Sequence, residues 1–457
     1  MRICGGTFLA AALSAFVLTG AADDCTLSKS STGLDRARLR VGAYSVNKVM
    51  MTEAHVRDVK ACGIDFLVGA PVDNREFLDW CEKYGVGIYV ANGVLLGVPG
   101  WWDHARHGGT PDDTNQLARV AELVDGFRKN LDHPAIEMID LYDEPSALTF
   151  PYYGELAAVV NELSVEKPGY VNLFPIYALA AGNSAAKQKS QLGAATYRDY
   201  IAEYCKYLPV DYICYDHYQF LSDNPSIVRK FGARSYENMI VVADACRATG
   251  RSFWYVAQVN SYAGSERKLS ANQLRYQAYS AMAFGAESIT WACYSRGWWK
   301  DNVIDDNGEK TEQYEKLKVV NAELHRLGPS YMRFRNTATS FVGFEGRLDE
   351  IPQSAGAALR ELNNGFFMNV RAKDGSPLVI GEMTARNLGD SAKALFVFAA
   401  GDVMDEYQAE HVVEFRVRGF GKVSALGPNG KIALEKGDAG RYSFRLKDCS
   451  CALIGIK

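Results

Sequence analysis

Residues 236–258 read YENMIVVADACRATGRSFWYVAQ and contain one complete helix-to-strand unit. The first part is amphipathic and ends at Gly250, and glycine directly after a periodic stretch is a common helix stop. The run 252–257 that follows is almost continuously apolar, with aromatic and β-branched residues. Such a run is typical of a strand whose two faces are both buried, as in a parallel sheet.

The same unit recurs along the chain between residues 38 and 330. We expect eight strands, at residues 39–44, 64–70, 86–91, 135–142, 170–175, 210–215, 252–257 and 288–294. We expect helices between them at 52–62, 74–83, 114–131, 154–165, 197–208, 236–249, 271–284 and 312–327, the last one stopped by Gly328-Pro329. Eight alternations predict a (β/α)8 TIM barrel over residues 35–330. A doubly wound open sheet would usually carry a glycine-rich phosphate loop after its first strand, and Tyr44 is followed by Ser-Val-Asn-Lys instead.

The pattern changes after Pro329. Short strands are expected at residues 341–344, 366–371, 378–382, 394–399, 412–417, 422–425 and 442–447, separated by turn pairs such as Asp374-Gly375. A short helix is expected at 355–362. Residues 331–457 are therefore predicted to form an antiparallel β-sandwich domain that docks against the barrel.

Composition sets limits on the function. The 457 residues are 48% hydrophobic and 23% charged, which is typical of a globular protein. The net charge of −4 does not give the basic surface expected of a nucleic-acid binder. Residues 1–22 resemble a secretory signal, because Arg2 precedes an apolar run too short to span a membrane. We therefore expect a secreted, periplasmic or cell-surface protein that does not insert into membranes. Oligomeric state is left open.

Cysteines give no sign of a metal site. Ten are present and Cys4 would leave with the signal, so the nine that remain include at least one free or intermolecular thiol. There is no Cys-x-x-Cys pair, and most of these residues are expected to be buried small hydrophobes. His104 and His107 near Asp103 do not have diagnostic spacing, so neither a metal nor a cofactor is predicted.

The chemistry should lie at the carboxyl ends of the barrel strands. The fourth strand ends Asp140-Leu-Tyr-Asp-Glu144-Pro145, and a period of two would place Asp140, Tyr142 and Glu144 on one face. A carboxyl such as Glu144 at the mouth of a barrel, among aromatic residues, can have a raised pKa and act as an acid.

This strand end resembles the Asn-Glu-Pro signature of the clan-A (β/α)8-barrel glycoside hydrolases, in which the glutamate is the general acid/base. The sixth strand, ending Tyr215-Asp-His-Tyr218, and the seventh and eighth strands, ending at Gln258 and Trp291, resemble the corresponding strands of the clan. The resemblance implies that Glu144 is the catalytic acid and that Trp291 contacts sugar.

Two positions depart from the clan's pattern. Asp143 replaces the usual asparagine, and Gln258 replaces the glutamate nucleophile. A carboxamide cannot form the ordinary glycosyl ester, so a second catalytic group is needed. Asp216 is the favoured candidate, with Asp143 and Glu266 as alternatives; Asp216 could equally orient His217 or a sugar hydroxyl.

Aromatic and polar residues after the strands are expected to bind carbohydrate. Large exposed aromatic patches usually mark binding sites. The candidates are Asp143, His217, Tyr218, Gln258, Trp291, Trp298, Trp299, Trp101 and Trp102, with Tyr44 and Asn172 as further site liners. The sequence thus predicts a secreted glycoside hydrolase with a carbohydrate substrate and with Glu144 and Asp216 as catalytic residues. The alternatives are an inactive barrel that binds carbohydrate, and another carbohydrate-active barrel enzyme such as a lyase.

Overall fold

The computed structural model describes residues 38–71, 74–91, 131–163, 167–180, 190–295, 297, 299–387, 391–404, 408–419 and 421–457. The expected signal segment, the helix expected at 114–131 apart from its last residue, and the side chains of Trp101, Trp102 and Trp298 lie outside these ranges. All cysteines in the described ranges are free thiols, and seven of the eight are buried.

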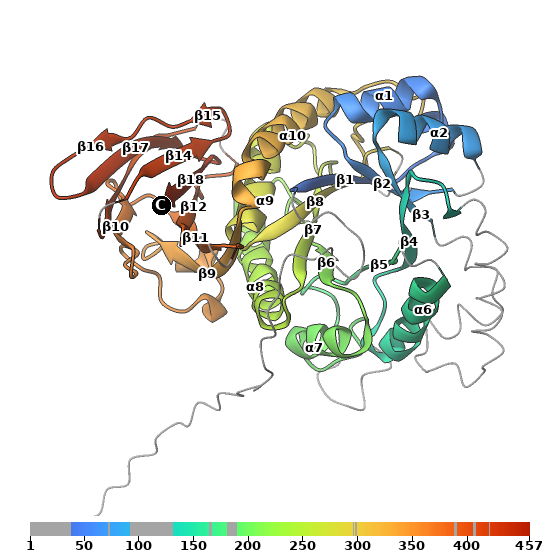
Figure 1. Ribbon diagram of the computed structural model, residues 1–457, viewed down its shortest axis with the longest axis horizontal. Helices are drawn as coiled ribbons and strands as arrows, with labels where there is room; N and C mark the ends of the chain where they lie inside the picture. Colours follow the sequence, from blue (N-terminus) through green and yellow to red (C-terminus); the bar gives the residue numbers. More distant parts are fainter. Residues whose placement is uncertain are drawn as a thin grey trace, which may run out of the picture.

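Eight parallel strands form the barrel in the order β5-β4-β3-β2-β1-β8-β7-β6 (Figure 1). Their bounds are β1 Arg40–Tyr44, β2 Phe66–Ala70, β3 Gly87–Val90, β4 Ile136–Asp143, β5 Gly169–Asn172, β6 Tyr212–Asp216, β7 Ser252–Gln258 and β8 Ala286–Ala292. A parallel bridge between Leu173 and Tyr215 joins β5 to β6 and closes the ring. All eight expected strands are present, displaced by no more than a few residues at their ends.

Helices surround this ring. The α-helices are α1 Glu53–Ala61, α2 Arg75–Tyr84, α6 Phe150–Leu163, α7 Tyr197–Tyr207, α8 Pro225–Thr249, α9 Ala271–Ala283 and α10 Glu312–Tyr331. Helix α8 begins earlier than expected because the Asn224 side chain caps it and proline is tolerated at its first position. Helix α10 runs through Pro329 to Tyr331, whose hydroxyl donates to the carbonyls of Met282 and Ala286.

The C-terminal part is a sandwich of two antiparallel sheets, ordered β10-β13-β17-β16 and β15-β14-β18-β12-β11-β9. The strands are β9 Phe334–Val342, β10 Phe367–Ala372, β11 Leu378–Ala385, β12 Lys393–Ala399, β13 Glu410–Val417, β14 Val423–Gly427, β15 Gly430–Lys431, β16 Glu435–Lys436, β17 Arg441–Lys447 and β18 Cys451–Ile456. The sequence prediction missed β18, which lies inside the larger sheet. The helix expected at 355–362 is not formed; Leu359 and Leu362 make bridges to Val342 and Val370 instead.

The sandwich packs against the α8–α10 side of the barrel (Figure 1). The ring of Phe398 lies 5.3 Å from that of Tyr276, and the ring of Phe396 lies 5.5 Å from that of Tyr331. An ion pair of 2.6 Å joins Arg386 to Glu287 beside these rings. The residues of the sandwich do not line the cavity at the carboxyl ends of β1 and β4–β6. None of the helices in the described ranges combines the length and apolar character needed to cross a membrane.

Candidate functional site

A cavity of about 220 Å³ opens at the carboxyl ends of the barrel strands. Strands β1, β4, β5 and β6 and the loops that follow them supply its walls. The lining residues are Tyr44, Asp143, Glu144, Asn172, Tyr177, Asp216 and Tyr218. Three of these are carboxylic acids and three are tyrosines, so the cavity offers proton donors and acceptors together with flat apolar ring faces.

Two adjacent acids at the end of β4, Asp143 and Glu144, enter this cavity, which a regular strand would not allow. The pairing of β4 with β5 shifts between Asp140 and Tyr142, and this bulge breaks the alternation of side chains. Tyr142 therefore packs outward on Tyr153 of α6, with ring centroids 5.1 Å apart, instead of sharing a face with Glu144 as expected. Glu144 follows the strand with φ 54°, a left-handed conformation that few non-glycine residues adopt.

Asn172, at the end of β5, holds the acids of the neighbouring strands. Its Nδ2 donates hydrogen bonds of 3.0 Å to Asp143 Oδ1 and of 3.0 Å to Asp216 Oδ1. Its backbone carbonyl accepts from the Glu144 N–H at 2.8 Å. An amide N–H donated to a carboxylate favours the ionised form. Asn172 thus connects all three cavity acids.

Glu144 and Asp216 lie together in the cavity as a pair of carboxyl groups. Burial raises the pKa of Glu144, and the charges of Asp216 and Asp143 raise it further. Burial and the charge of Asp143 also raise the pKa of Asp216, while hydrogen bonds from Asn172 and Glu144 oppose that rise. Two buried carboxyls in contact cannot both ionise easily. The pKa of Glu144 is raised further than that of Asp216, so Glu144 holds its proton to the higher pH.

Among the three candidates for the second acid, the cavity contains two. Asp216 is 3% exposed and Asp143 is open to the cavity. Glu266 lies on the exposed loop after β7, where its backbone N–H donates to Asp223 at 2.7 Å, and it does not line the cavity. Tyr177, in the loop after β5, was missed by the sequence analysis; an aromatic residue a few positions beyond a strand end was the available signal.

Gln258, Trp291 and His217 were expected to bind sugar, but all three are buried in the interior. Gln258 is fully buried: its Oε1 accepts from the Phe220 N–H, and its Nε2 donates to the carbonyls of Phe220 and Asn260. Trp291 is fully buried and donates from Nε1 to Asn321 of α10, so it points into the helix layer. Neither lines the cavity, because both have their polar atoms committed to neighbouring loops and helices.

His217 is also buried behind the cavity. Its Nδ1 lies 3.3 Å from Asn238 Oδ1, and its Nε2 lies 3.3 Å from the Phe231 carbonyl. Burial lowers the pKa of His217 to about 4, so the ring is neutral at physiological pH. Its edge contacts the ring of Tyr177 at 5.0 Å, which makes His217 a support for the cavity wall.

Similarity to known proteins is found in the fold and not in the sequence. No family model matches the chain, and no curated protein matches it. A solved structure of a catalytic mutant of Gan42B, a GH42 β-galactosidase from G. stearothermophilus, aligns with 94% of this chain and 99% of its own, with 8% identity and a TM-score of 0.55. The chain has the fold of the clan-A glycoside hydrolases. The barrel and the β-sandwich predicted from the sequence are thereby confirmed.

Two further structures are similar to the chain. An endo-β-1,4-mannanase from Thermotoga petrophila aligns with 91% of this chain and 92% of its own at 10% identity, with a TM-score of 0.43. A β-galactosidase from the psychrophilic Marinomonas ef1 aligns with 63% of this chain at 9% identity and a TM-score of 0.45, and this chain spans 60% of that protein's length.

Aromatic residues continue from the cavity to the rim of the barrel. Trp299, after β8, meets the ring of Tyr218 edge-on at 4.8 Å and the ring of Tyr262 edge-on at 5.9 Å. Tyr218 lines the cavity, and Tyr262 is 39% exposed. The three rings form an aromatic surface that leads from the cavity to solvent.

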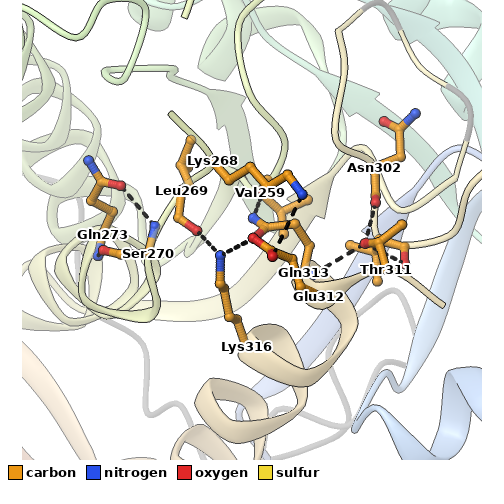
Figure 2. A network of polar contacts seen from close by, with 11 residues as sticks. Val259, Lys268, Leu269, Ser270, Gln273, Asn302, Thr311, Glu312, Gln313 and Lys316 are labelled. Carbon is orange, nitrogen blue, oxygen red and sulfur yellow. Dashed lines mark hydrogen bonds and ion pairs between the residues drawn. The ribbon is translucent and has the colours of Figure 1, made fainter. Parts of the chain in front are cut away.

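The loop that carries Tyr262 is fixed by polar contacts to α10 (Figure 2). Lys316 donates to the Leu269 carbonyl at 3.1 Å, and Gln313 donates to the Val259 carbonyl at 2.8 Å. A capping box of Ser270 and Gln273 then starts α9. The loop is thus anchored at both ends while Tyr262 stays at the surface between them.

One group of metal-ligand residues occurs in the described ranges, away from the cavity. It consists of Asp79 and Glu82 on α2 with His133, whose ligand atoms lie within 4.8 Å of one another. His133 Nδ1 accepts from the Ala135 N–H at 3.1 Å, so in the neutral ring the proton is on Nε2, which faces Asp79 at 3.0 Å. That nitrogen has no free lone pair for a metal, so the group is better explained as a hydrogen bond between His133 and the acids of α2.

Proposed function

We propose that this protein is a secreted glycoside hydrolase that cleaves an O-glycosidic bond in the β1/β4–β6 cavity. Glu144 acts as the general acid that protonates the leaving oxygen and then as the base toward water. Asp216 is the ionised partner, and Tyr218 and Trp299 bind sugar. The observation that supports this most is the placement of Glu144 and Asp216 in one cavity at the carboxyl ends of the strands, where barrel enzymes carry their catalytic groups.

The pair suits this chemistry for a physical reason. An acid must hold its proton at the working pH and release it only to the transition state, and the raised pKa of Glu144 meets that condition. The carboxylate of Asp216 lies beside it and can stabilise the positive charge that develops on the sugar ring.

A second candidate function is carbohydrate binding on a barrel without activity. The observation that favours it is Gln258, which stands at the end of β7 and is tied into the interior. This candidate predicts saturable sugar binding without turnover.

The test compares the full chain with Glu144→Gln on a panel of oligosaccharides and aryl glycosides, with products identified by mass spectrometry. Glu266→Gln is the matched control, because it makes the same change in an exposed loop outside the cavity. We expect cleavage by the parent and the control, and a loss of about 100-fold or more for Glu144→Gln. Equal cleavage by all three proteins would contradict the assignment, and calorimetric binding without cleavage would favour the second candidate.

A further inference from the structure

A chain of hydrogen bonds runs through the barrel interior from Tyr44 to Asn172. The Tyr44 hydroxyl donates to the Tyr170 hydroxyl at 2.9 Å. The Tyr170 hydroxyl lies 3.2 Å from Cys214 Sγ, and the Cys214 thiol donates to Asn172 Oδ1 at 3.7 Å. Because the thiol has one hydrogen and gives it to Asn172, Tyr170 is the donor to the sulfur. The chain thus begins and ends at residues that line the cavity, and every group along it donates in the same direction.

The two ends of the Asn172 amide have different partners. Nδ2 donates to Asp143 and to Asp216, at 3.0 Å in each case. Oδ1 accepts from Cys214, which is the one donor to this oxygen in the described part of the chain. Asn172 is 3% exposed and Cys214 is 1% exposed. The thiol therefore satisfies the buried oxygen that the amide turns away from the acids.

An asparagine amide can take two orientations that exchange its oxygen and its nitrogen. When Nδ2 faces the two acids it donates to them, and this favours their ionised forms. When Oδ1 faces them it can only accept, and this favours their protonated forms. A donor to Oδ1 on the far side stabilises the first orientation, and so it opposes protonation of the acids.

We propose that Cys214 is a positioning residue whose thiol holds the Asn172 amide with Nδ2 toward the two aspartates. This inference rests on the proposed function, which gives Asp216 its part in the reaction, and it adds a residue that acts through Asn172. Tyr170 orients the thiol, because its hydroxyl donates to the sulfur and leaves the S–H free to point at Asn172. Burial raises the pKa of the Cys214 thiol, so the group stays protonated and serves as a donor.

Other titratable groups face the same end of the barrel. Burial raises the pKa of Asp140, Asp143 and Glu144, the three acids of the β4 end. The tyrosines around the cavity stay neutral between pH 5 and pH 8, because burial raises their pKa values; they are Tyr44, Tyr177 and Tyr218. His217, behind Tyr177, is neutral in this range as well. The groups that can change charge here are therefore carboxyls, and Glu144→Gln removes one of them.

The experiment compares Cys214→Ala and Cys214→Ser in the Glu144→Gln background, by urea unfolding at pH 5 and pH 8. The pKa of Asp216 is raised in the folded protein, so stability is lost as pH rises from the ordinary aspartate range toward the folded value. Without the thiol donor that value is higher, and more stability is lost by pH 8. We expect the folding equilibrium constant of the alanine variant to fall between the two pH values by about 3- to 10-fold more than that of the background, which is the size of one hydrogen bond.

Serine is the matched control, because its hydroxyl also donates to Oδ1, and its pH dependence should equal that of the background. Tyr170→Phe keeps the ring that packs on Tyr89 and Tyr212 but removes the donor to the sulfur. It should shift the pH dependence in the same direction as alanine, by a smaller factor. An alanine variant that loses the same stability at both pH values would overturn the inference, because a packing defect does not depend on pH. If that variant does not fold, an unchanged pH dependence in Tyr170→Phe would overturn it.

Infrared spectroscopy tests the thiol directly. The difference between the parent and Cys214→Ser isolates the S–H stretching band of Cys214. The difference between the parent and Cys81→Ala gives the same band for a buried thiol that makes no hydrogen bond within the described part of the chain. We expect the Cys214 band at the lower frequency, because donation to an oxygen weakens the S–H bond. Equal frequencies would overturn the inference.

These readouts need no substrate, so they separate the inference from the proposed function. If the parent cleaves no glycoside, the proposed function fails, and unfolding and infrared spectra still test the position of the amide. If the parent cleaves one, Cys214→Ala should move the acid limb of kcat/KM to higher pH and Cys214→Ser should restore it. The same acid limb in all three proteins would overturn the inference and leave the glycosidase function standing.

Discussion

Glu144 and Asp216 line one cavity from the ends of two barrel strands that are not neighbours in the sheet. The strand between them is β5, and its last residue, Asn172, donates to Asp216 and to Asp143 while its carbonyl accepts from the Glu144 N–H. The pair therefore depends on closure of the barrel between β5 and β6, which places the ends of three strands around one amide group. This arrangement explains how three acids can lie in a single cavity without being driven apart.

The two raised pKa values predict a bell-shaped pH profile. Activity requires Glu144 protonated and Asp216 ionised, and burial raises both pKa values. We therefore expect kcat/KM to fall on the acid side at a pH above the ordinary aspartate range, and to fall on the alkaline side only well above the ordinary glutamate range. Initial rates of the active glycoside between pH 4 and 10, in buffers of constant ionic strength, would measure this. A profile with its acid limb near pH 4 would contradict the assignment of Asp216.

Asn172→Asp should lower activity and move the acid limb of that profile upward. The change replaces a donor to two carboxylates by another acid, so the pKa of Asp216 should rise and its ionised form should become scarce at neutral pH. We expect kcat/KM at pH 6 to fall roughly 10- to 100-fold, with partial recovery at higher pH. Asn224→Asp is the matched control, because aspartate caps a helix as well as asparagine does. An equal loss of kcat/KM at every pH would mean that Asn172 has only a structural role.

Glu144→Gln should stabilise the protein at neutral and alkaline pH. The raised pKa means that the folded chain holds a proton that the unfolded chain has already lost near pH 7. Stability therefore falls as pH rises from the ordinary glutamate range toward the folded pKa, and glutamine removes this loss while it can still donate to Asp216. We expect the free energy of unfolding to rise by about 1 kcal/mol or more at pH 8, since one pKa unit is about 1.4 kcal/mol, with a smaller gain at pH 5. Urea unfolding at both values would decide; an equal effect at both would contradict the protonated state of Glu144.

Trp299→Ala should weaken substrate binding more than it slows the chemical step. The side chain packs edge-on between Tyr218 and Tyr262, so its loss removes a stacking surface and loosens the other two rings. We expect KM to rise about 10-fold, the equivalent of roughly 1.4 kcal/mol, with kcat changed less. Phe366→Ala in the sandwich, also an exposed aromatic residue, is the control. Unchanged KM would show that the rim does not contact the substrate.

The barrel could be predicted from the sequence because its strands are buried on both faces. Such strands are continuous apolar runs, and glycine or proline marks the ends of many helices between them, so all eight strands were found. The same property hides which way each side chain points. Trp291 and Gln258 were expected in the site, yet one donates to a helix and the other to loop carbonyls. A strand that is apolar on both faces carries no pattern that separates the interior of the barrel from the helix layer.

The sequence identified the acids of the site but did not predict how they come together. Glu144 and Asp216 were chosen because they end strands, which a sequence shows directly. Their meeting with Asp143 depends on the bulge in β4 and on the left-handed conformation of Glu144, and neither feature has a mark in the residue types themselves. Regular alternation would have placed Asp143 on the opposite face from Glu144. Local backbone irregularity, which depends on tertiary pairing, decided the site.

We predict that His411 makes the stability of the sandwich depend on pH. Its Nδ1 lies 2.8 Å from Asp374 and 2.9 Å from the Ser376 hydroxyl, and its Nε2 lies 2.8 Å from Asp448. Burial lowers the pKa of His411, but the hydrogen bonds to the two aspartates outweigh it and the pKa is raised. The charged ring therefore contributes stability below the ordinary histidine pKa, and this contribution is lost as pH rises through the folded value.

The test is urea unfolding of the parent and of His411→Gln at pH 5.5 and pH 8.5, both in the Glu144→Gln background so that the cavity pair does not titrate. We expect the substitution to cost about 1–2 kcal/mol at pH 5.5, where it removes hydrogen bonds between charged groups, and less at pH 8.5. The pH dependence that remains should be smaller in the variant. The same cost at both pH values would mean that His411 packs in the sandwich as a neutral ring and that the two aspartates do not hold its charge.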